Sequence, residues 1–474
     1  MGHQIALTCS VLALAFAAVA RSQGPPDPDE IRAGRQALET GHPQEARVHF
    51  AAALTHAEAS REDRFAALIG LGRADLWLGH YRTAVADFRG AREAASSEID
   101  RHVAETGLAR ALNSLEHYNE AYGLVAPFAT GDLAATVELL RAANGTGRFD
   151  EAAPYIAANP PASDSTRLGQ EFLRQKDDIG LQLSKRIDAQ ALYSDDSDGL
   201  NVRTYSLGTW LPGPASAQLF ETWHLNLAST SVAAGGVTDQ LTQVDVGAAA
   251  RIGAAQHLNA LIGAASVGGW KFAEGSLEWE AQLSDNAAVN ASLERAPILT
   301  TLALADRLLF STYTLGASAR LSDHWSIVPV YFHQEFSDGN RRDGGHLKIV
   351  LSPYDIPNTT SALGAQIDLR GYDSSMPTTG IYFNPAHYLL VRTGVIAAQQ
   401  ISVNWRLRLV AGVGSETIDG ASTSSYAWDL SLQGRLPANG RLVVHLGRDS
   451  FASMAGGGSG YWNNTATLSI VYPY

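Results

Sequence analysis

The sequence predicts an α-helical solenoid followed by an antiparallel transmembrane β-barrel of about 16 strands. Up to about residue 178, apolar residues recur at helical spacing and one pattern repeats; from about residue 182 they alternate with polar residues at a period of two. Near the amino end lies one long apolar run, and after it no run is long enough to cross a bilayer as a helix. We therefore expect three parts: residues 1–20, residues 24–178 and residues 182–474.

Residues 1–20 have the pattern of a secretory signal peptide. The apolar run from Ile5 to Ala20 closes on A-V-A, an A-x-A cleavage pattern, and Arg21 follows it. The single cysteine, Cys9, lies within this predicted signal. The mature chain would then have no thiol, which excludes disulfides, thiolate nucleophiles and cysteine metal sites.

Residues 24–178 contain an internal repeat. A glycine, an alanine and a phenylalanine recur at the same offsets 38 residues later, and the second copy reads W-L-G-H-Y-R-T-A-V-A-D-F. This copy is close to the tetratricopeptide pattern W-x2-L-G-x2-Y, A-x3-F, so we expect a solenoid of three to four such repeats. Small alanines would let paired helices approach closely, while aromatic rings fill the gap between them. The predicted packing residues are Gly41, Ala46, Phe50, Gly79, Tyr81, Ala84, Phe88, Tyr118 and Ala121.

From about residue 182 the chain predicts strands. Around 405 to 413, for example, Trp405, Leu407 and Leu409 oppose Arg406 and Arg408. About sixteen such segments can be marked, an even number as a single-chain bacterial barrel requires. They lie near 182–194, 200–211, 217–229, 240–252, 257–267, 275–285, 287–295, 311–322, 325–336, 345–353, 361–370, 388–401, 403–414, 425–436, 440–448 and 461–474.

A soluble β-sandwich also alternates, so loop lengths must separate the two folds. Stretches such as S-T-S-V-A-A-G-G-V-T-D and S-D-G-N-R-R-D-G-G follow the odd segments, whereas tight links such as S-D-N-A and P-A-N-G follow the even ones. Short turns at one rim and long loops at the other are typical of outer-membrane barrels. The second face of the strands also carries many Arg, Asp, Gln and His residues, where a soluble core would need hydrophobic ones. Both observations favour the barrel and a contact with outer-membrane lipid.

Composition and motifs argue against several function classes. A formal net charge of −13 and a pI of about 5.5 argue against nucleic acid as a partner. The sequence contains no nucleotide-binding P-loop, no G-x-S-x-G elbow and no H-E-x-x-H helix motif. A glycosidase would need a pair of catalytic carboxylates, and the spacing of Asp and Glu along the sequence singles out no such pair. We therefore expect no cofactor, no metal site, no catalytic residues and no enzyme activity.

Two segments resemble one family of bacterial outer-membrane exporters, the exporters of the cellulose synthase complex. Gly380 to Tyr388, G-I-Y-F-N-P-A-H-Y, is similar to the G-x-Y-F-S-P-x-x-Y segment of this family's barrel, and Glu294 to Ala303 is similar to its R-x-P-V-T-D-S-L. Thr301 replaces the family's usual acidic residue and Asn384 its usual serine. More distantly, the chain resembles the poly-N-acetylglucosamine porin. The positions in the matching segments are Arg295, Pro297, Thr300, Gly380, Tyr382, Phe383, Asn384, Pro385 and Tyr388.

The resemblance implies secretion of an exopolysaccharide, with a cellulose-like glucan as the first expectation. It places the barrel in the bacterial outer membrane and the helical repeats in the periplasm. There the repeats would bind an inner-membrane polysaccharide synthase complex or other periplasmic proteins. A surface receptor or general porin that uses the barrel as an anchor, and a barrel enzyme, stay open as alternatives.

Both matching segments lie in predicted long loops that contain many apolar residues. Such loops would be covered if they folded back into the lumen, so we expect Arg295 to Phe310 and Tyr372 to His387 to form a constriction or gate. A loop that packs on its neighbour for rigidity is the alternative. Aromatic faces such as Tyr382 and Trp462 could stack on sugar rings. The predicted lumen residues are Arg203, Asp368, Arg370, Arg406, Arg408 and Asp429, whose mixed charges would exchange hydrogen bonds with a sliding sugar chain.

Overall fold

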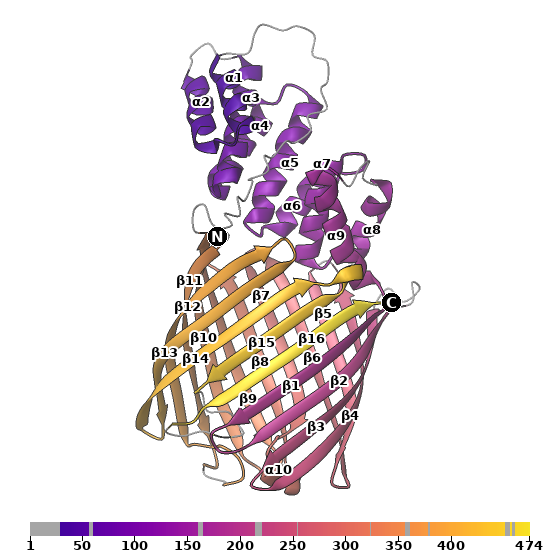
Figure 1. The fold of residues 1–474 in the computed structure, drawn as a ribbon, viewed down its shortest axis with the longest axis vertical. Helices are drawn as coiled ribbons and strands as arrows, with labels where there is room; N and C mark the ends of the chain where they lie inside the picture. The colour runs from indigo at the N-terminus through magenta and orange to yellow at the C-terminus, as the bar shows by residue number, and fades with distance from the viewer. Residues whose placement is uncertain are drawn as a thin grey trace, which may run out of the picture. The chain divides into compact units, whose positions relative to one another are not determined.

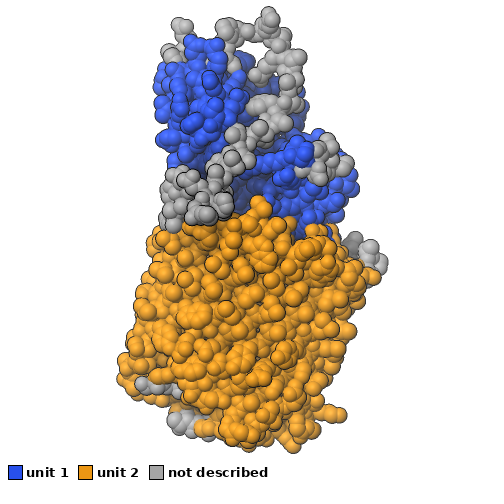
Figure 2. All heavy atoms as spheres, in the orientation of Figure 1, with its two compact units in different colours: residues 1–182 blue, residues 183–474 orange. Residues whose placement is uncertain are grey.

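The computed structural model divides into two units, Met1–Gln182 and Leu183–Tyr474, which Figure 2 colours blue and orange. It describes residues 29–55, 60–159, 165–213, 220–253, 255–322, 324–355, 361–377, 380–450, 456 and 460–474. The predicted signal peptide, residues 1–20, lies outside the described residues. Among the described helices, none is both long and apolar enough to cross a membrane.

The first unit is helical (Figure 1). From α1 to α8, neighbouring helices pack against each other in chain order, which is the arrangement that a short solenoid requires. The helices are α1 (Asp29–Glu39), α2 (Pro43–Thr55), α3 (Arg61–Leu78), α4 (Tyr81–Ala94), α5 (Glu98–Ser114), α6 (Tyr118–Val125), α7 (Leu133–Thr146), α8 (Phe149–Ala158) and α9 (Arg167–Leu183).

Short turns join the two helices of each repeat. Gly41, Gly79 and Gly147 occupy the corresponding positions with φ of 84°, 78° and 68°, a left-handed conformation that ends a helix without a Cβ penalty. In the third repeat Glu116 takes this position with φ of 61°. Helix starts are also encoded locally: the Ser60 hydroxyl accepts the Asp63 backbone N–H in a capping box at α3.

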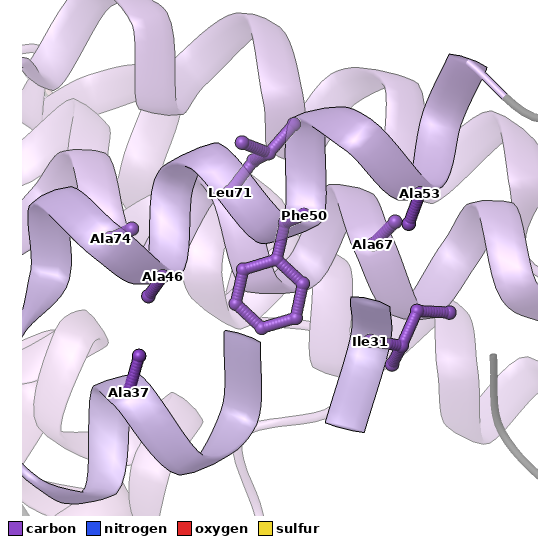
Figure 3. Close-up of a cluster of buried hydrophobic side chains, with 8 residues drawn as sticks. All are labelled: Ile31, Ala37, Ala46, Phe50, Ala53, Ala67, Leu71 and Ala74. Atoms are coloured by element: carbon purple, nitrogen blue, oxygen red, sulfur yellow. The ribbon is translucent and has the colours of Figure 1, made fainter. Parts of the chain in front are cut away.

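In three of the four repeats, an aromatic ring fills a space left by a glycine in the next helix pair. Figure 3 shows Phe50 of α2 within its apolar cluster, where it is 1% exposed. A Cβ on Gly70 would lie 2.4 Å from the Phe50 ring, and Phe88 has the same relation to Gly107. Tyr118 fills the corresponding space over Gly145. The predicted packing alanines Ala46, Ala84 and Ala121 are fully buried around these rings, while Tyr81 is half-buried.

The second unit is a closed barrel of sixteen antiparallel strands, which confirms the predicted fold class. Each strand pairs with its neighbours in sequence, and β1 pairs with β16. The strands are β1 (Arg186–Asp196), β2 (Asn201–Pro212), β3 (Phe220–Ala234), β4 (Val237–Ile252), β5 (Gln256–Val267), β6 (Trp270–Ser284), β7 (Ala287–Pro297), β8 (Leu309–Arg320), β9 (Trp325–Phe336), β10 (Arg341–Asp355), β11 (Ser361–Ser374), β12 (His387–Ser402), β13 (Trp405–Ile418), β14 (Ala421–Arg435), β15 (Arg441–Asp449) and β16 (Asn463–Pro473).

One face of the wall is apolar and exposed all around the ring. Leu207, Leu227 and Val244 are successive register partners on β2, β3 and β4, and all three are exposed. Exposed aromatics mark both ends of this face, Trp223, Trp325 and Tyr472 at one end and Tyr193, Tyr205, Tyr313 and Tyr426 at the other. A lipid-facing band between two aromatic girdles has this composition. We call the opposite, inward face the lumen.

Several predicted long loops are tight turns instead. Between β3 and β4 the chain turns at Gly235 and Gly236, with φ of 57° and 82°, as a two-residue hairpin turn requires. Ser229 and Ser231 belong to β3, although their polarity predicts a loop. Strands continue beyond the lipid band, where outward residues need not be apolar. For the same reason β10 begins at Arg341, and residues 337–340 suffice to join it to β9.

Candidate functional site

The lumen face carries the charged residues of the barrel wall. On β11, Asp368 and Arg370 alternate with the outward-facing Ile367 and Leu369. On β13, Arg406 and Arg408 alternate with Leu407 and Leu409, and Asp429 on β14 faces inward as well. The structure therefore places five of the six predicted lumen residues on the inward face.

Arg203 lies on the other face, which corrects its assignment to the lumen. It is a register partner of Tyr193 and shares a face with Tyr205 and Leu207. Its guanidinium lies 5.7 Å from the centre of the Tyr193 ring. Arg203 is thus an outward residue near one girdle of aromatic side chains.

The two rims of the barrel differ. Strand β1 starts and β16 ends at the rim that we call the terminal rim, where the Tyr474 N–H donates to the Lys185 carbonyl. At the opposite, far rim, residues 298–308 join β7 to β8 and residues 375–386 join β11 to β12. Figure 1 shows the C terminus at the first of these rims and α10 at the second.

The β7–β8 loop folds onto the lumen side of the wall. Its helix α10 (Thr301–Ala305) begins at Thr300, whose hydroxyl accepts the Ala303 N–H. Leu304 packs against Val232 and Leu241, inward residues of β3 and β4. Since β4 is not a neighbour of β7 or β8 in the ring, the loop must leave its own part of the wall to make this contact.

The two segments that resemble the exporter family meet at the far rim. The Thr300 hydroxyl donates to the Ile381 carbonyl over 3.2 Å, although the residues are 81 positions apart. Ile298, Ala303 and Leu308 form one buried cluster with Tyr382. We call these two loops, residues 298–308 and 375–386, the paired loops.

Arg342 of β10 lies at the centre of the paired loops and is 3% exposed. Its guanidinium donates to the Asn384 side-chain oxygen and to the Phe383 carbonyl. It also lies 5.0, 4.9 and 5.7 Å from the ring centres of Phe336, Tyr372 and Tyr382. A buried guanidinium between aromatic faces and amide oxygens holds the β11–β12 loop through both cation–π and hydrogen-bond contacts.

Tyr382 is a buried anchor, which corrects its prediction as a free stacking platform. Its ring stacks on Phe336 at 5.0 Å, and its hydroxyl donates to Asp338 and accepts from Asn340. Burial raises the pKa of Tyr382 to about 12, so the hydroxyl stays a neutral donor. The other residue predicted to stack on sugar rings is Trp462, and the Arg448 guanidinium carbon lies 4.4 Å from the centre of its ring.

A second aromatic pair supports the paired loops from the wall. Tyr372 and Tyr388 stack at 4.8 Å, and the Tyr388 hydroxyl donates to Glu416 over 2.8 Å. Phe383 packs on this pair. Two residues of the G-I-Y-F-N-P-A-H-Y segment, Phe383 in its middle and Tyr388 at its carboxyl end, thus pack against the inner wall.

A chain of charged side chains crosses the inner wall. His346 of β10 contacts Asp368 at 2.7 Å, and Arg392 of β12 lies 3.6 Å from Asp368 and 2.7 Å from Asp449 of β15. Arg392 can lie flat against the wall because β13 presents Gly412, where a Cβ would be 3.2 Å from the arginine side chain. These contacts connect four strands of the inner wall, β10, β11, β12 and β15.

The structure corrects the boundaries of the predicted gate and adds residues to it. Arg295 and Pro297 belong to β7, with Arg295 on the outward face, and Tyr372 and His387 belong to strands β11 and β12. Gly380, with φ of 71°, and Pro385 lie within the β11–β12 loop. Sequence reasoning missed Arg342, because its R-R-D-G-G context resembles a loop. It also missed Arg392, although the alternation of β12 places it inward.

Among the described residues, no group of three or more His, Cys, Asp or Glu side chains could hold a metal ion. Comparison of the sequence with protein-family models finds no match, and comparison with curated proteins finds none either.

Solved structures do resemble the fold. A bacterial polysaccharide outer membrane secretin matches with a TM-score of 0.52 and 12% identity, over 62% of this chain and 99% of that one. CdiB from Acinetobacter baumannii matches with a TM-score of 0.40 and 10% identity, over 61% of this chain and 60% of its own. OprD from Pseudomonas aeruginosa matches with a TM-score of 0.35 and 10% identity, over 61% of this chain and 94% of its own. At 12% identity, the likeness to the secretin shows the fold alone, which is that of an outer-membrane barrel.

Proposed function

We propose that this protein is an outer-membrane porin that secretes an exopolysaccharide, with a cellulose-like glucan as its cargo. The barrel supplies the path through the membrane, and the paired loops close that path at the far rim. The helical unit lies in the periplasm and binds periplasmic partners. The chain acts as a channel and not as an enzyme.

The contact between the two family-like segments carries this proposal. Glu294 to Ala303 and Gly380 to Tyr388 are the segments that resemble the cellulose exporter, and Thr300 donates to Ile381 where they meet. A contact between two separate matching segments is expected if both serve one task. The first solved structure named above, a polysaccharide secretin, has the same barrel fold and supports the same class of cargo.

The chemistry of the lumen suits a hydrated sugar chain. Inward amides, carboxylates and guanidiniums can exchange hydrogen bonds with hydroxyls, and a conduit needs contacts that are weak enough to release the polymer. Passage at this membrane would be passive. The paired loops would act as a gate, since their buried apolar residues and Arg342 favour a docked state that cargo must displace.

The helical unit offers apolar positions for a partner. Ile99 and Val103, one turn apart on α5, are 71% and 39% exposed. Stacked helical repeats commonly bind proteins or polymers on such surfaces. A component of an inner-membrane polysaccharide synthase complex is the partner that the proposed cargo requires.

Efflux from proteoliposomes tests the proposal. Vesicles that contain the full-length mature chain would be loaded with fluorescent β-1,4-gluco-oligosaccharides. A matched variant would replace residues 299–307 by a short Gly-Ser linker. We expect slow efflux from wild-type vesicles, efflux at least ten times faster from the variant, and none from protein-free vesicles.

Each alternative function gives another result. A general porin would pass glucose and short maltosaccharides equally fast with or without the loop. A surface receptor would pass no sugar in either form. Absence of efflux from the loop variant, with the barrel folded as judged by its heat-dependent mobility in a detergent gel, would refute export.

A further inference from the structure

The inward-facing charges of the barrel are unevenly distributed. Strands β4 to β7 carry mostly carboxylates, with Arg251 as an inward cation, and strands β10 to β15 carry more cations than carboxylates. The inward carboxylates of β10 to β15 are Asp368, Glu416, Asp429 and Asp449. The inward carboxylates of β4 to β7 are Asp239, Asp245, Glu274, Glu278, Glu280 and Glu294. The inward cations of β10 to β15 are Arg342, Lys348, Arg370, Arg392, Arg406, Arg408, Arg435 and Arg441.

The ring order places these two sets on opposite walls. In a closed barrel of sixteen strands, a strand faces the one eight positions further along. Strand β6 therefore faces the region of β13 and β14 across the lumen. We call strands β4 to β7 the acidic wall and strands β10 to β15 the basic wall.

Some members of each wall are bonded to neighbouring side chains. On the acidic wall, Asp245 accepts a hydrogen bond from Asn226 at 3.0 Å, and Glu274 accepts two from Gln243. On the basic wall, Arg392 is held between two carboxylates. These groups shape the wall and offer little charge to a passing chain.

Two pairs of inward side chains, one on each of two facing regions of the ring, are exposed to water. Glu278 and Glu280 alternate with Leu277 and Trp279 on β6, so both point into the lumen. Arg406 and Arg408 do the same on β13, where their register partners are the neutral Gln433 and Ser431. No ion pair joins these four side chains to another residue within the described part of the chain.

We propose that Glu278 and Glu280 opposite Arg406 and Arg408 form a charge filter, and that the exported chain is an uncharged, hydroxyl-rich glycan. This inference rests on the proposed export function and assigns the residues that select its cargo by charge. Carboxylates accept hydrogen bonds from sugar hydroxyls, and guanidiniums donate to hydroxyl and ring oxygens. A neutral chain finds partners on both walls and is free to slide between them.

A charged polymer is disfavoured by one wall and held by the other. A polyanion is repelled by the two glutamates and retained by the two arginines, and a polycation meets the reverse. Conduction needs binding that is weak enough to release the cargo. A lumen for a polyanion would instead require basic residues all around the ring.

Ion selectivity of the full chain in planar bilayers tests the placement of the filter. The two filter variants are Glu278→Gln with Glu280→Gln, and Arg406→Gln with Arg408→Gln. In a tenfold KCl gradient, we expect the glutamate variant to move the reversal potential toward that of Cl⁻ and the arginine variant to move it toward that of K⁺. Arg203→Gln, on the outward face, is the matched control and should leave it unchanged. Equal potentials in all four proteins would overturn the placement.

Efflux of three probes tests the cargo class. The probes are cello-oligosaccharides, oligogalacturonate as the polyanion and chitosan oligomers as the polycation, each measured in the variant with the shortened β7–β8 loop. We expect the neutral probe to leave at least ten times faster than either charged probe. Combining both pairs of substitutions should bring the efflux of the two charged probes toward that of the neutral probe, because it removes the repelling and the retaining side chains together.

The outcomes separate this inference from the function on which it rests. Equal efflux of all three probes would overturn the filter but leave export standing. Opposite shifts of the reversal potential without efflux of any probe would refute export, and the cargo assignment with it.

Discussion

Replacement of Arg342 by methionine should release the β11–β12 loop. The change keeps most of the side-chain volume but removes the guanidinium that contacts Phe336, Tyr372 and Tyr382 and donates to Phe383 and Asn384. At the low end of the usual range, a charged hydrogen bond contributes about 1.5 kcal/mol. Of the three rings only that of Tyr382 lies on the loop, and this contact contributes about 0.5 kcal/mol. With two hydrogen bonds, the docked state would lose about 3.5 kcal/mol, or about a 300-fold rise in the undocked population.

Two measurements would detect the release of the β11–β12 loop. Single-channel recording of the full chain should show long openings in Arg342→Met that are rare in wild type. Limited proteolysis should cleave within residues 375–386 of the variant first. Arg342→Lys keeps the charge but loses the planar guanidinium, so its open probability and its rate of cleavage should lie between those of wild type and Arg342→Met.

Folding of the barrel must be checked in the same samples. Heat-dependent mobility in a detergent gel should stay the same in Arg342→Met, since the strand register does not depend on this side chain. Arg203→Met, on the outward face, serves as the control substitution. If Arg342→Met and Arg203→Met have the same open probability and the same cleavage pattern, the role given to Arg342 is wrong.

Three other predictions concern the helical unit and the wall. Gly107→Ala should lower the stability of the helical unit by about 1 to 3 kcal/mol, because the new Cβ would lie 2.4 Å from the Phe88 ring. The Cβ of Gly123→Ala would meet no atom within 4 Å, so this variant should stabilise the unit slightly. Loss of helical circular dichroism on heating measures both effects. Burial, followed by the hydrogen bond with Asp75, raises the pKa of Asp87 to about 7, so the wild-type unit should lose stability as pH rises from about 4 through 7. Asp87→Asn cannot ionise and should unfold at a higher temperature than wild type at pH 8. The difference between the two unfolding temperatures should be smaller at pH 5, and an equal difference at both pH values would contradict the raised pKa of Asp87. Gly414→Val should prevent or weaken barrel assembly, because its Cβ would lie 2.0 Å from the Val391 carbonyl oxygen; a heat-stable folded band of normal yield would contradict this.

The two-residue period predicts strands and their faces well because a barrel wall separates lipid from water. Strand β9 spans the predicted residues 325–336, and Arg406 and Arg408 face inward as the alternation requires. The same rule fails beyond the lipid band. There Arg203 occupies an outward position that its polarity does not reveal, and Ser229 and Ser231 continue a strand that their composition predicts to end.

The paired loops were harder to predict because their stability comes from distant contacts. Helix α10 has five residues, too few to form from local preference alone. Leu304 becomes buried against Val232 and Leu241, more than sixty positions earlier in the chain. Sequence similarity indicated that both loop segments matter, but only the fold brings Thr300 to Ile381.

A reversible covalent link between the paired loops tests the central claim most directly. A disulfide between Thr300→Cys and Ile381→Cys would join the loops at the point where the Thr300 hydroxyl contacts the Ile381 carbonyl. The sequence has no cysteine after Cys9, so no native thiol of the mature chain would compete. After oxidation, with the link verified by gel mobility, efflux of β-1,4-gluco-oligosaccharides should stop, and a reductant should restore it. Both single-cysteine variants should be insensitive to the reductant. Equal efflux from the oxidised and reduced double variant would contradict the claim that cargo leaves through a lumen closed by these loops.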